Sequence, residues 1–381
     1  MKRSDCSGND EVKKLKRVLC IVGAMNVGGA ETFLMKLYRN MDRSKYQMDF
    51  CVFDPKKGSY DDEITQMGGR IFHCVSKSSN PIKSFLELKK IVKENEFELV
   101  LRISQHSLSA MELLAAKLGG AKKTIFRSSN SSTCGSAVNQ LMHKLCKPLA
   151  KYVPEVKIAP STEAAEFMFG KKSVKKGKVV FLRNGLAVSD FTFDEENRSN
   201  LRKELNLEDK FIIGHVGRFQ RQKNHKFLID VFEEILKQKE SAHLVLVGDT
   251  GELLEETKSY VTELGLESKV TFIGNRSDVN RLLSAFDMLV FPSLYEGMPN
   301  VVIEAQAAGL PCLIADTITP EADITGLVTY MSLTESAEKW AEKCLEIKDK
   351  ETTRKNTKEN FIKAKYDINS VTDEFIKLVF S

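Results

Sequence analysis

Two basic side chains follow a strand-like run of the sequence and could bind an anionic group. The run at 211–216 leads into Gly217, and Arg218 and Lys223 come shortly afterwards. Arginine can hold phosphate oxygens in a fork, and lysine adds a compact positive charge. Two fixed cations can stabilise a leaving diphosphate without a metal ion. The spacing indicates a phosphate-binding loop, although a solvated basic loop would have the same composition.

Two glutamates accompany a second strand-like run, at 288–291. Glu296 falls in the loop after that run, and Glu304 falls inside the apolar helical pattern that follows. Between them lie Met298, Pro299 and Asn300. A carboxylate among apolar neighbours is costly to bury unless it accepts hydrogen bonds, and sugar hydroxyls are suitable donors. The pattern favours a sugar or ribose site, with pairing of Glu304 to a buried arginine as the structural alternative.

A glycine-rich turn follows the first strand-like run, at 18–22. Gly28 and Gly29 lie just before a helical pattern, where glycine allows close approach of the backbone and the helix N-terminus attracts anions. The spacing differs from the dinucleotide fingerprint G-x-G-x-x-G, so NAD is not favoured. A tight turn without a ligand would need the same glycines.

The elements that must position these residues alternate between short β-branched or aromatic runs and longer helical patterns. This alternation predicts an α/β protein with parallel sheets and right-handed crossovers. The strand-like runs are at 18–22, 48–53, 97–103, 123–127, 179–182, 211–216, 244–247, 270–273, 288–291 and 312–315.

A polar, acidic stretch after Asn184-Gly185 is typical of an interdomain hinge. Two open parallel sheets that face each other bring their strand carboxyl ends to one shared cleft. We therefore expect residues 1–185 and 186–365 to form two Rossmann-like domains across a cleft. We expect residues 366–381 to form a helix that crosses back to the first domain.

Charge is distributed unevenly along the chain, whose net charge is +5. Residues 1–190 hold 33 Lys and Arg against 19 Asp and Glu, which gives +14, and the remainder holds 24 against 33, which gives −9. A basic half could meet anionic lipid headgroups or an acceptor phosphate, or be an ordinary basic surface. No apolar run reaches the roughly 20 residues of a spanning helix. We expect a cytoplasmic protein with no nucleic-acid partner.

These motifs together resemble the retaining glycosyltransferases of family four, which have the GT-B fold. The resemblance extends from about Arg17 to the end, and its branch builds bacterial capsular and exopolysaccharides. The motifs that carry it are Gly28-Gly29-Ala30-Glu31, Gly217-Arg218 with Lys223-Asn224, and Glu296-x7-Glu304.

The resemblance implies a role for each matched position. Arg218 and Lys223 would hold the donor diphosphate, Glu304 the ribose hydroxyls, and Glu296 the hydroxyls of the transferred sugar. Arg276 would lie near the nucleobase. The other residues expected to line the nucleotide sugar are Gly28, Gly29, Gly217, Met298, Pro299 and Asn300.

The chain departs from the family where relatives often carry a His-x-His pattern. Arg102 and Ser104 occupy those places and leave His106 nearby, as an acceptor-orienting or charge-stabilising group or as a plain loop histidine. The end of the next run, with Arg127 and Asn130, also lacks the usual histidine and is expected to face the acceptor.

The resemblance implies transfer of a hexose, with retention of configuration, from a nucleotide diphosphate sugar to a polyprenyl-diphosphate-linked glycan. We expect a UDP-sugar in preference to a GDP-sugar, no metal or other cofactor, and peripheral contact with the anionic inner face of the plasma membrane. The alternatives are a nucleotide-sugar epimerase and a catalytically silent nucleotide-sugar-binding subunit of a polysaccharide assembly.

Overall fold

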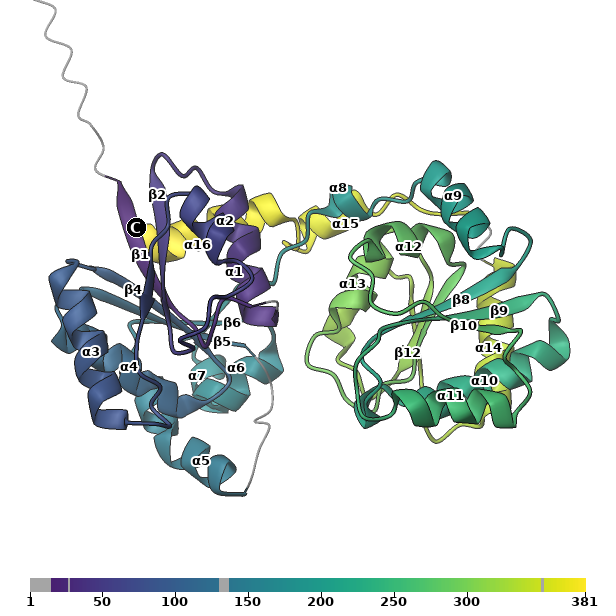
Figure 1. The fold of residues 1–381 in the computed structure, drawn as a ribbon, viewed down its shortest axis with the longest axis horizontal. Coiled ribbons are helices and arrows are strands. Elements are labelled where there is room, and N and C mark those ends of the chain that lie inside the picture. The colour runs from purple at the N-terminus through teal and green to yellow at the C-terminus, as the bar shows by residue number, and fades with distance from the viewer. Residues whose placement is uncertain (1–14, 27, 130–136, 351–352) are drawn as a thin grey trace, which may run out of the picture. The chain divides into compact units, whose positions relative to one another are not determined.

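The computed structural model describes residues 15–26, 28–129, 137–350 and 353–381 (Figure 1). The chain divides into two compact units, one formed by residues up to 184 together with 371–381, and the other by residues 185–370. No helix among the described residues is long and apolar enough to cross a lipid bilayer.

The first unit contains a seven-stranded parallel sheet in the order β3-β2-β1-β4-β5-β6-β7. Central strands of a parallel sheet are covered on both faces, and the run from Val18 to Ile21 in β1 is fully buried. The strands are β1 (Lys16–Ile21), β2 (Tyr46–Val52), β3 (Ile71–His73), β4 (Leu99–Ser104), β5 (Lys123–Ser128), β6 (Val156–Ala159) and β7 (Val180–Phe181).

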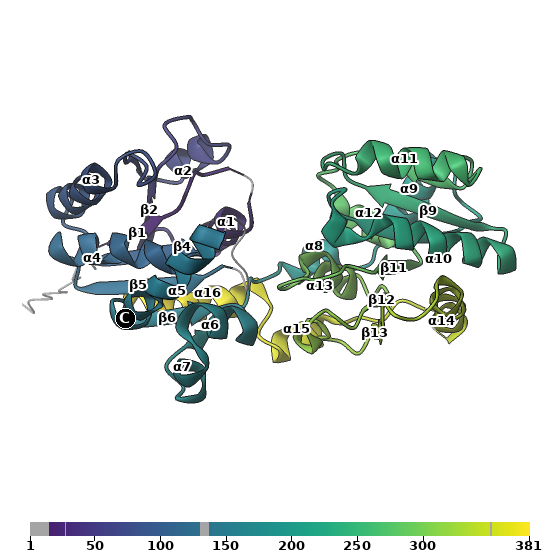
Figure 2. The same ribbon diagram turned by 90° about the horizontal axis from the view of Figure 1, so that it is seen from below.

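Helices cover both faces of this sheet. Residues of α3, α4 and α5 share one core with Leu19 and Ile21 of β1, and α16 packs near α1 through a hydrogen bond from Asn40 to Thr372 of 3.2 Å. Figure 2 shows α4 and α5 lying along the sheet. The helices are α1 (Gly29–Asn40), α2 (Asp61–Gln66), α3 (Pro81–Glu94), η1 (Ser107–Ser109), α4 (Ala110–Leu118), α5 (Ala137–Tyr152), α6 (Thr162–Phe169), α7 (Lys171–Lys175) and α16 (Ile368–Phe380).

The second unit contains a six-stranded parallel sheet in the order β10-β9-β8-β11-β12-β13. Alternate residues of its strands enter two cores, with Ile213 and Leu244 on one face and Ile212 and Val245 on the other. The strands are β8 (Phe211–Val216), β9 (Ala242–Val247), β10 (Val270–Phe272), β11 (Met288–Phe291), β12 (Cys312–Ala315) and β13 (Val328–Met331).

Helices cover both faces of the second sheet as well. The predicted α/β class with two parallel sheets is therefore confirmed. The helices are α8 (Val188–Phe191), α9 (Glu195–Leu205), η2 (Arg221–Lys223), α10 (His225–Gln238), α11 (Leu254–Glu263), α12 (Val279–Ala285), α13 (Asn300–Ala307), η3 (Pro320–Ala322), α14 (Ala337–Lys350) and α15 (Lys358–Lys363).

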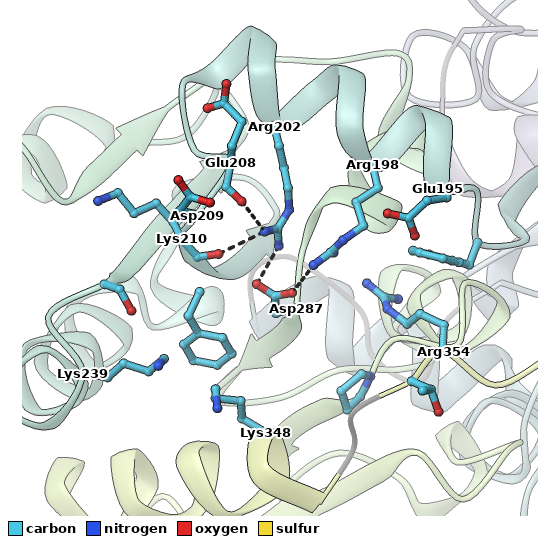
Figure 3. Close-up of a pocket in the computed structure, with 15 residues that line it drawn as sticks. Glu195, Arg198, Arg202, Glu208, Asp209, Lys210, Lys239, Asp287, Lys348 and Arg354 are labelled. Atoms are coloured by element: carbon cyan, nitrogen blue, oxygen red, sulfur yellow. Dashed lines mark hydrogen bonds and ion pairs between the residues drawn. The ribbon is translucent and has the colours of Figure 1, made fainter.

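Three arginines gather around Asp287 at the amino-terminal edge of the second sheet, beside a hollow of about 770 Å³ (Figure 3). Arg198 and Arg202 each hold one carboxylate oxygen of Asp287 at 2.6 Å. Arg354 donates to the carbonyl oxygens of Leu283 and Phe286, at the carboxyl end of α12. Guanidinium groups near a helix C-terminus satisfy its free carbonyls. This cluster is built for stability, because its donors are directed at the protein's own backbone.

We expect Asp287→Asn to destabilise the second unit by about 3 kcal/mol, because it leaves partly buried arginines without their counter-charge. Urea unfolding followed by the fluorescence of Trp340, the only tryptophan and a buried residue of this unit, measures the effect. Asp209→Asn on the exposed rim of the same hollow is the control. Equal unfolding midpoints for the two variants would contradict this role of Asp287.

Candidate active site

The order of the second sheet creates a crevice between β8 and β11. The chain moves from β8 outward through β9 and β10, and from β11 outward through β12 and β13 in the other direction. Ligands of open parallel sheets bind at the strand carboxyl ends where the order reverses in this way. The loops that leave β8 and β11 carry both predicted motifs, since Arg218 and Lys223 follow β8 and Glu296 follows β11.

Lys223 and Glu296 form an ion pair at this crevice. The Lys223 Nζ donates to Glu296 Oε1 at 2.7 Å, and the two side chains are only 18% and 10% exposed. The same ammonium group lies 4.4 Å from the ring centroid of Phe291, the last residue of β11. A Cβ atom at Gly217 would lie 3.0 Å from the Cε of Lys223, so glycine gives the lysine room to cross the loop. The structure thus brings three of the sequence-predicted residues together.

Hydrogen bonds join the two loops on either side of the ion pair. The backbone N–H of Leu294 donates to the carbonyl of Gln222 at 2.8 Å, and the Gln222 side chain donates to the carbonyl of Tyr295 at 2.9 Å. Asn224, in the left-handed conformation with φ of 56°, donates from Nδ2 to the carbonyl of Pro292 at 3.2 Å. The loops therefore form one preorganised surface.

Five further predicted residues lie on the same two loops or on the helix that follows: Arg218, Met298, Pro299, Asn300 and Glu304. Arg218 is exposed, and Glu304 is half-buried on α13. Helix α13 begins at the exposed Asn300 after Pro299 and has no side-chain cap at Pro299, and its N-terminal end carries a partial positive charge. Met298 contacts the Tyr366 hydroxyl at 3.5 Å, which fixes the entry to the helix.

Arg276 follows β10, the edge strand of the sheet, and is held by two carboxylates. Its Nε and Nη2 donate to Asp278 at 2.8 Å each, and Nη1 donates to Glu204 at 2.8 Å. These bonds raise the pKa of Arg276 further above its ordinary value. The guanidinium therefore fixes the loop after β10, and any base contact by Arg276 stays a prediction.

A pair of buried histidines lies beneath Lys223, and the sequence analysis did not identify it. His215 donates from Nδ1 to the carbonyl of Val290 at 2.9 Å, and its ring stacks on Phe291 with centroids 5.3 Å apart. His225 lies 4.8 Å from His215, and both of its ring nitrogens are buried without a hydrogen-bond partner. Burial, with Lys223 nearby, lowers the pKa of His225 to about 4. Both imidazoles are neutral at pH 7 and add no positive charge beside the lysine.

The first unit has an equivalent crevice between β1 and β4. Gly28 precedes α1, and a Cβ atom there would lie 2.6 Å from Glu31 Oε2, whereas Gly29 is exposed with open space around it. Burial raises the pKa of Glu31. The glycine turn therefore lies at the start of a helix, next to a carboxylate that is partly screened from water.

His106 follows β4 at the same crevice, and both of its ring nitrogens are engaged. Its Nδ1 accepts from the backbone N–H of Leu108 at 3.1 Å, which leaves Nε2 to donate to the carbonyl of Asn139 at 2.9 Å. A neutral imidazole has one donor and one acceptor, so this arrangement uses both. His106 caps η1 and ties it to α5, and its predicted catalytic role stays a prediction.

Two arginines of this unit lie in its interior. Arg102 forms an ion pair with Glu112 and donates to the carbonyl of Ile21 at 2.9 Å. Arg127 is 2% exposed, donates to Asn184 at 2.7 Å and lies 3.8 Å from the ring centroid of Phe33. Burial lowers the pKa of Arg127 to about 9. The predicted acceptor residue Asn130 lies outside the described residues.

Two parallel-sheet α/β units, with the Arg218/Lys223 loop and the Glu296-x7-Glu304 segment at one switch point, have the organisation of a glycosyltransferase with the GT-B fold. The family model for glycosyl transferases group 1 matches residues 197–364. Together with a glycosyltransferase relative that is 36% identical over 86% of the chain, this match shows that the chain belongs to the family. The predicted resemblance to GT-B glycosyltransferases of bacterial capsule and exopolysaccharide assembly is thereby confirmed.

Known proteins are similar over most of the chain. The putative glycosyltransferase EpsF of Bacillus subtilis is 36% identical over 332 residues, which are 86% of each protein. An Escherichia coli UDP-Gal:alpha-D-GlcNAc-diphosphoundecaprenol alpha-1,3-galactosyltransferase is 29% identical over 62% of each. Among solved structures, HepE of Anabaena in complex with UDP has a TM-score of 0.76 at 19% identity, covering 95% of this chain and 99% of HepE.

The buried His225 should make the second unit sensitive to acid. A folded-state pKa of about 4, below the ordinary histidine value of 6.5, means that the unfolded chain binds more protons, so stability is lost as the pH falls below about 6.5. We expect this term to cost about 2 kcal/mol at pH 5, and His225→Phe to remove it.

Urea unfolding followed by Trp340 fluorescence at pH 8 and pH 5 tests this expectation. The wild type should lose more stability between these pH values than His225→Phe does, and His73→Gln at an exposed position controls for the loss of an imidazole. Equal losses in the wild type and His225→Phe would show that His225 does not carry the effect.

Proposed function

We propose that the chain transfers a hexose, with retention of anomeric configuration and without a metal ion, from a UDP-sugar to a lipid-linked glycan in polysaccharide assembly. The observation that carries the proposal is the Lys223–Glu296 pair at the switch point between β8 and β11. A cation for a diphosphate and a carboxylate for sugar hydroxyls lie 2.7 Å apart there, on loops joined by hydrogen bonds.

The donor diphosphate would be held by Lys223, Arg218 and the N-terminus of α13. In the transfer, the bond between the anomeric carbon and the phosphate oxygen breaks, and its electron pair leaves with the diphosphate. The acceptor oxygen forms the new bond to carbon, and its proton passes to an oxygen of the donor phosphate. Fixed positive charge around the diphosphate stabilises the negative charge that develops there.

Donor binding must change the hydrogen-bond partners of Lys223 and Glu296. Lys223 and Glu296 satisfy each other in the described structure, and a sugar diphosphate would offer phosphate oxygens to the lysine and hydroxyl donors to the glutamate. Exchange of one set of charge-assisted hydrogen bonds for another avoids leaving either charge buried and unpaired. Glu304, on the next helix, would accept from the ribose hydroxyls.

The acceptor proposal draws on the E. coli relative, whose name specifies a diphosphoundecaprenol-linked sugar. An acceptor of that kind stays in the bilayer, so the enzyme must work at the inner face of the plasma membrane from the cytoplasm. The excess of basic residues in 1–190 favours contact with an anionic surface. UDP in the HepE structure supports UDP as the nucleotide.

Sugar transfer should survive EDTA, because Arg218 and Lys223 already supply the positive charge at the diphosphate. Lys223→Met should lower turnover about a hundredfold under the same conditions. Release of UDP from a panel of UDP-sugars, with a lipid-linked glycan present, measures both effects. Activity that EDTA abolishes and only Mn²⁺ or Mg²⁺ restores would refute metal independence.

Glu304→Ala should weaken UDP binding about tenfold or more, because the ribose contact exists in the free nucleotide. Glu296→Ala should lower turnover without weakening UDP binding, since it removes the sugar contact and frees Lys223 for phosphate. Calorimetry with UDP and steady-state kinetics separate the two, with Glu255→Ala at an exposed position as the control.

Unchanged UDP affinity in Glu304→Ala would show that the ribose assignment is wrong. UDP binding with no turnover of any donor would instead favour a silent nucleotide-sugar-binding subunit.

A further inference from the structure

The second unit contains a small core at the place where the chain enters and leaves it. The chain enters this unit at Gly185 and leaves it after Ser370. Leu186, just inside the unit, packs with Phe361 and Tyr366, which come shortly before the exit. The backbone N–H of Leu186 donates to the carbonyl of Tyr366 at 2.7 Å. The entering and leaving segments are therefore tied to each other within the second unit.

Helix α13, which carries Glu304, lies between this small core and one of the two cores that cover the sheet. Ile303 and Ala307 enter the small core, and Val302 enters the core of the sheet. Successive side chains of a helix point about 100° apart. Packing of Val302 and Ile303 in two different cores therefore fixes the direction in which Glu304 leaves the helix.

The return segment also holds the carboxyl-terminal end of α13. The Thr357 hydroxyl donates to the carbonyl of Gln306 at 2.9 Å, at the end of the helix. A Cβ atom at Gly309 would lie 2.4 Å from the carbonyl oxygen of Lys355, so only glycine allows the two backbones to approach this closely. The helix that carries Glu304 is thus attached to the segment that leads back to the first unit.

Tyr366 joins this segment to the loop that precedes α13. Its hydroxyl donates to Met298 Sδ at 3.5 Å, and its ring lies edge-on to Phe361 with centroids 6.4 Å apart. Met298 comes two residues after Glu296 and two before the start of α13, and it packs against both cores. Tyr366 is 3% exposed. It therefore holds the short segment that separates Glu296 from the helix of Glu304.

We propose that Tyr366 is a positioning residue for the donor. It fixes Met298, and through Met298 it sets the positions of Glu296 and of the start of α13. The inference rests on the proposed function, because it adds a residue to the donor site described there. Such support matters because a misplacement of about 1 Å, caused by a change far from the chemistry, can lower activity about a hundredfold.

A tyrosine that only filled the small core would have different effects when it is changed. Its loss would lower the fraction of folded protein, and with it the number of UDP-binding sites and kcat, while the Kd for UDP stayed constant. Loss of a positioning residue raises the Kd for UDP and the KM for the donor in protein that is fully folded. Calorimetry separates these cases, because it gives the number of sites and the Kd independently.

A double-mutant cycle measured by UDP calorimetry on the full chain tests the proposal. Tyr366→Phe keeps the ring and removes the hydroxyl, and it should weaken UDP binding about fivefold. Met298→Leu keeps the volume and removes the sulfur, and the double variant should bind UDP no more weakly than Met298→Leu alone, because both changes remove one contact. Tyr260→Phe is the matched control, since it removes a hydroxyl that donates to Asp230 between α10 and α11.

Equal numbers of UDP-binding sites in all variants, with a raised Kd in Tyr366→Phe and a non-additive double variant, support the proposal. An unchanged Kd in Tyr366→Phe overturns it, and so do fully additive effects of the two changes. A raised Kd in Tyr260→Phe that matches the one in Tyr366→Phe also overturns it, because loss of any buried tyrosine hydroxyl would then suffice.

The same variants are assayed for release of UDP from UDP-sugars with a lipid-linked glycan present. A raised donor KM with nearly unchanged kcat in Tyr366→Phe supports the positioning role. The predicted order of UDP affinities without transfer of any sugar would support the role of Tyr366 and count against the proposed function alone.

Discussion

Lys223 is largely buried, so its positive charge needs a counter-charge nearby, and the site of the second unit depends on this ion pair. Glu296 supplies the charge from a different loop, and this fixes the two loops after β8 and β11 relative to one another. Gly217 gives room for the lysine stem, and Phe291 presents its ring to the ammonium group. The neutral His215 and His225 beneath it add no competing charge at pH 7. The charge at this crevice is therefore that of the Lys223–Glu296 pair, with the exposed Arg218 on the same loop as the lysine.

The first unit also contains a buried cation that needs a counter-charge, and here the cation is an arginine. Arg102 is buried, forms an ion pair with Glu112 and donates a hydrogen bond to the carbonyl of Ile21. Lys77 joins the same carboxylate at 2.9 Å, so Glu112 balances two cations. Removing a buried carboxylate of this kind would leave uncompensated charge in the core, a far larger penalty than the loss of a surface ion pair. Arg102, at a place where the family resemblance implied a histidine, is therefore a buried structural residue.

The α/β class and the positions of the loops that carry Arg218, Lys223 and Glu296 could be predicted because their signals are local. Strands at the centre of each sheet are buried on both faces and read as apolar runs, as in β1 and β11. Three strands were missed. The edge strands β3 and β13 have only partly buried residues, and the interior strand β6 has four residues of which the first two are only partly buried, so no apolar run marks them. The sequence also placed Lys223 and Glu296 on loops that each follow a strand. It could not show that they pair, because the pairing depends on the order of β8 and β11 in the sheet.

The environments of the histidines could not be predicted from the sequence either. His215 and His225 lie in an apolar strand and at a helix start, and only tertiary packing makes them a buried pair. His106 had the position of a reacting group, but its lone pair accepts from Leu108 and its N–H donates to Asn139. An imidazole engaged in this way has no free site for the proton of an acceptor hydroxyl unless η1 or α5 moves. Transfer of that proton to the donor's own phosphate needs no such movement, which is why the proposed mechanism assigns the base to the substrate and leaves His106 to hold α5 at the acceptor edge.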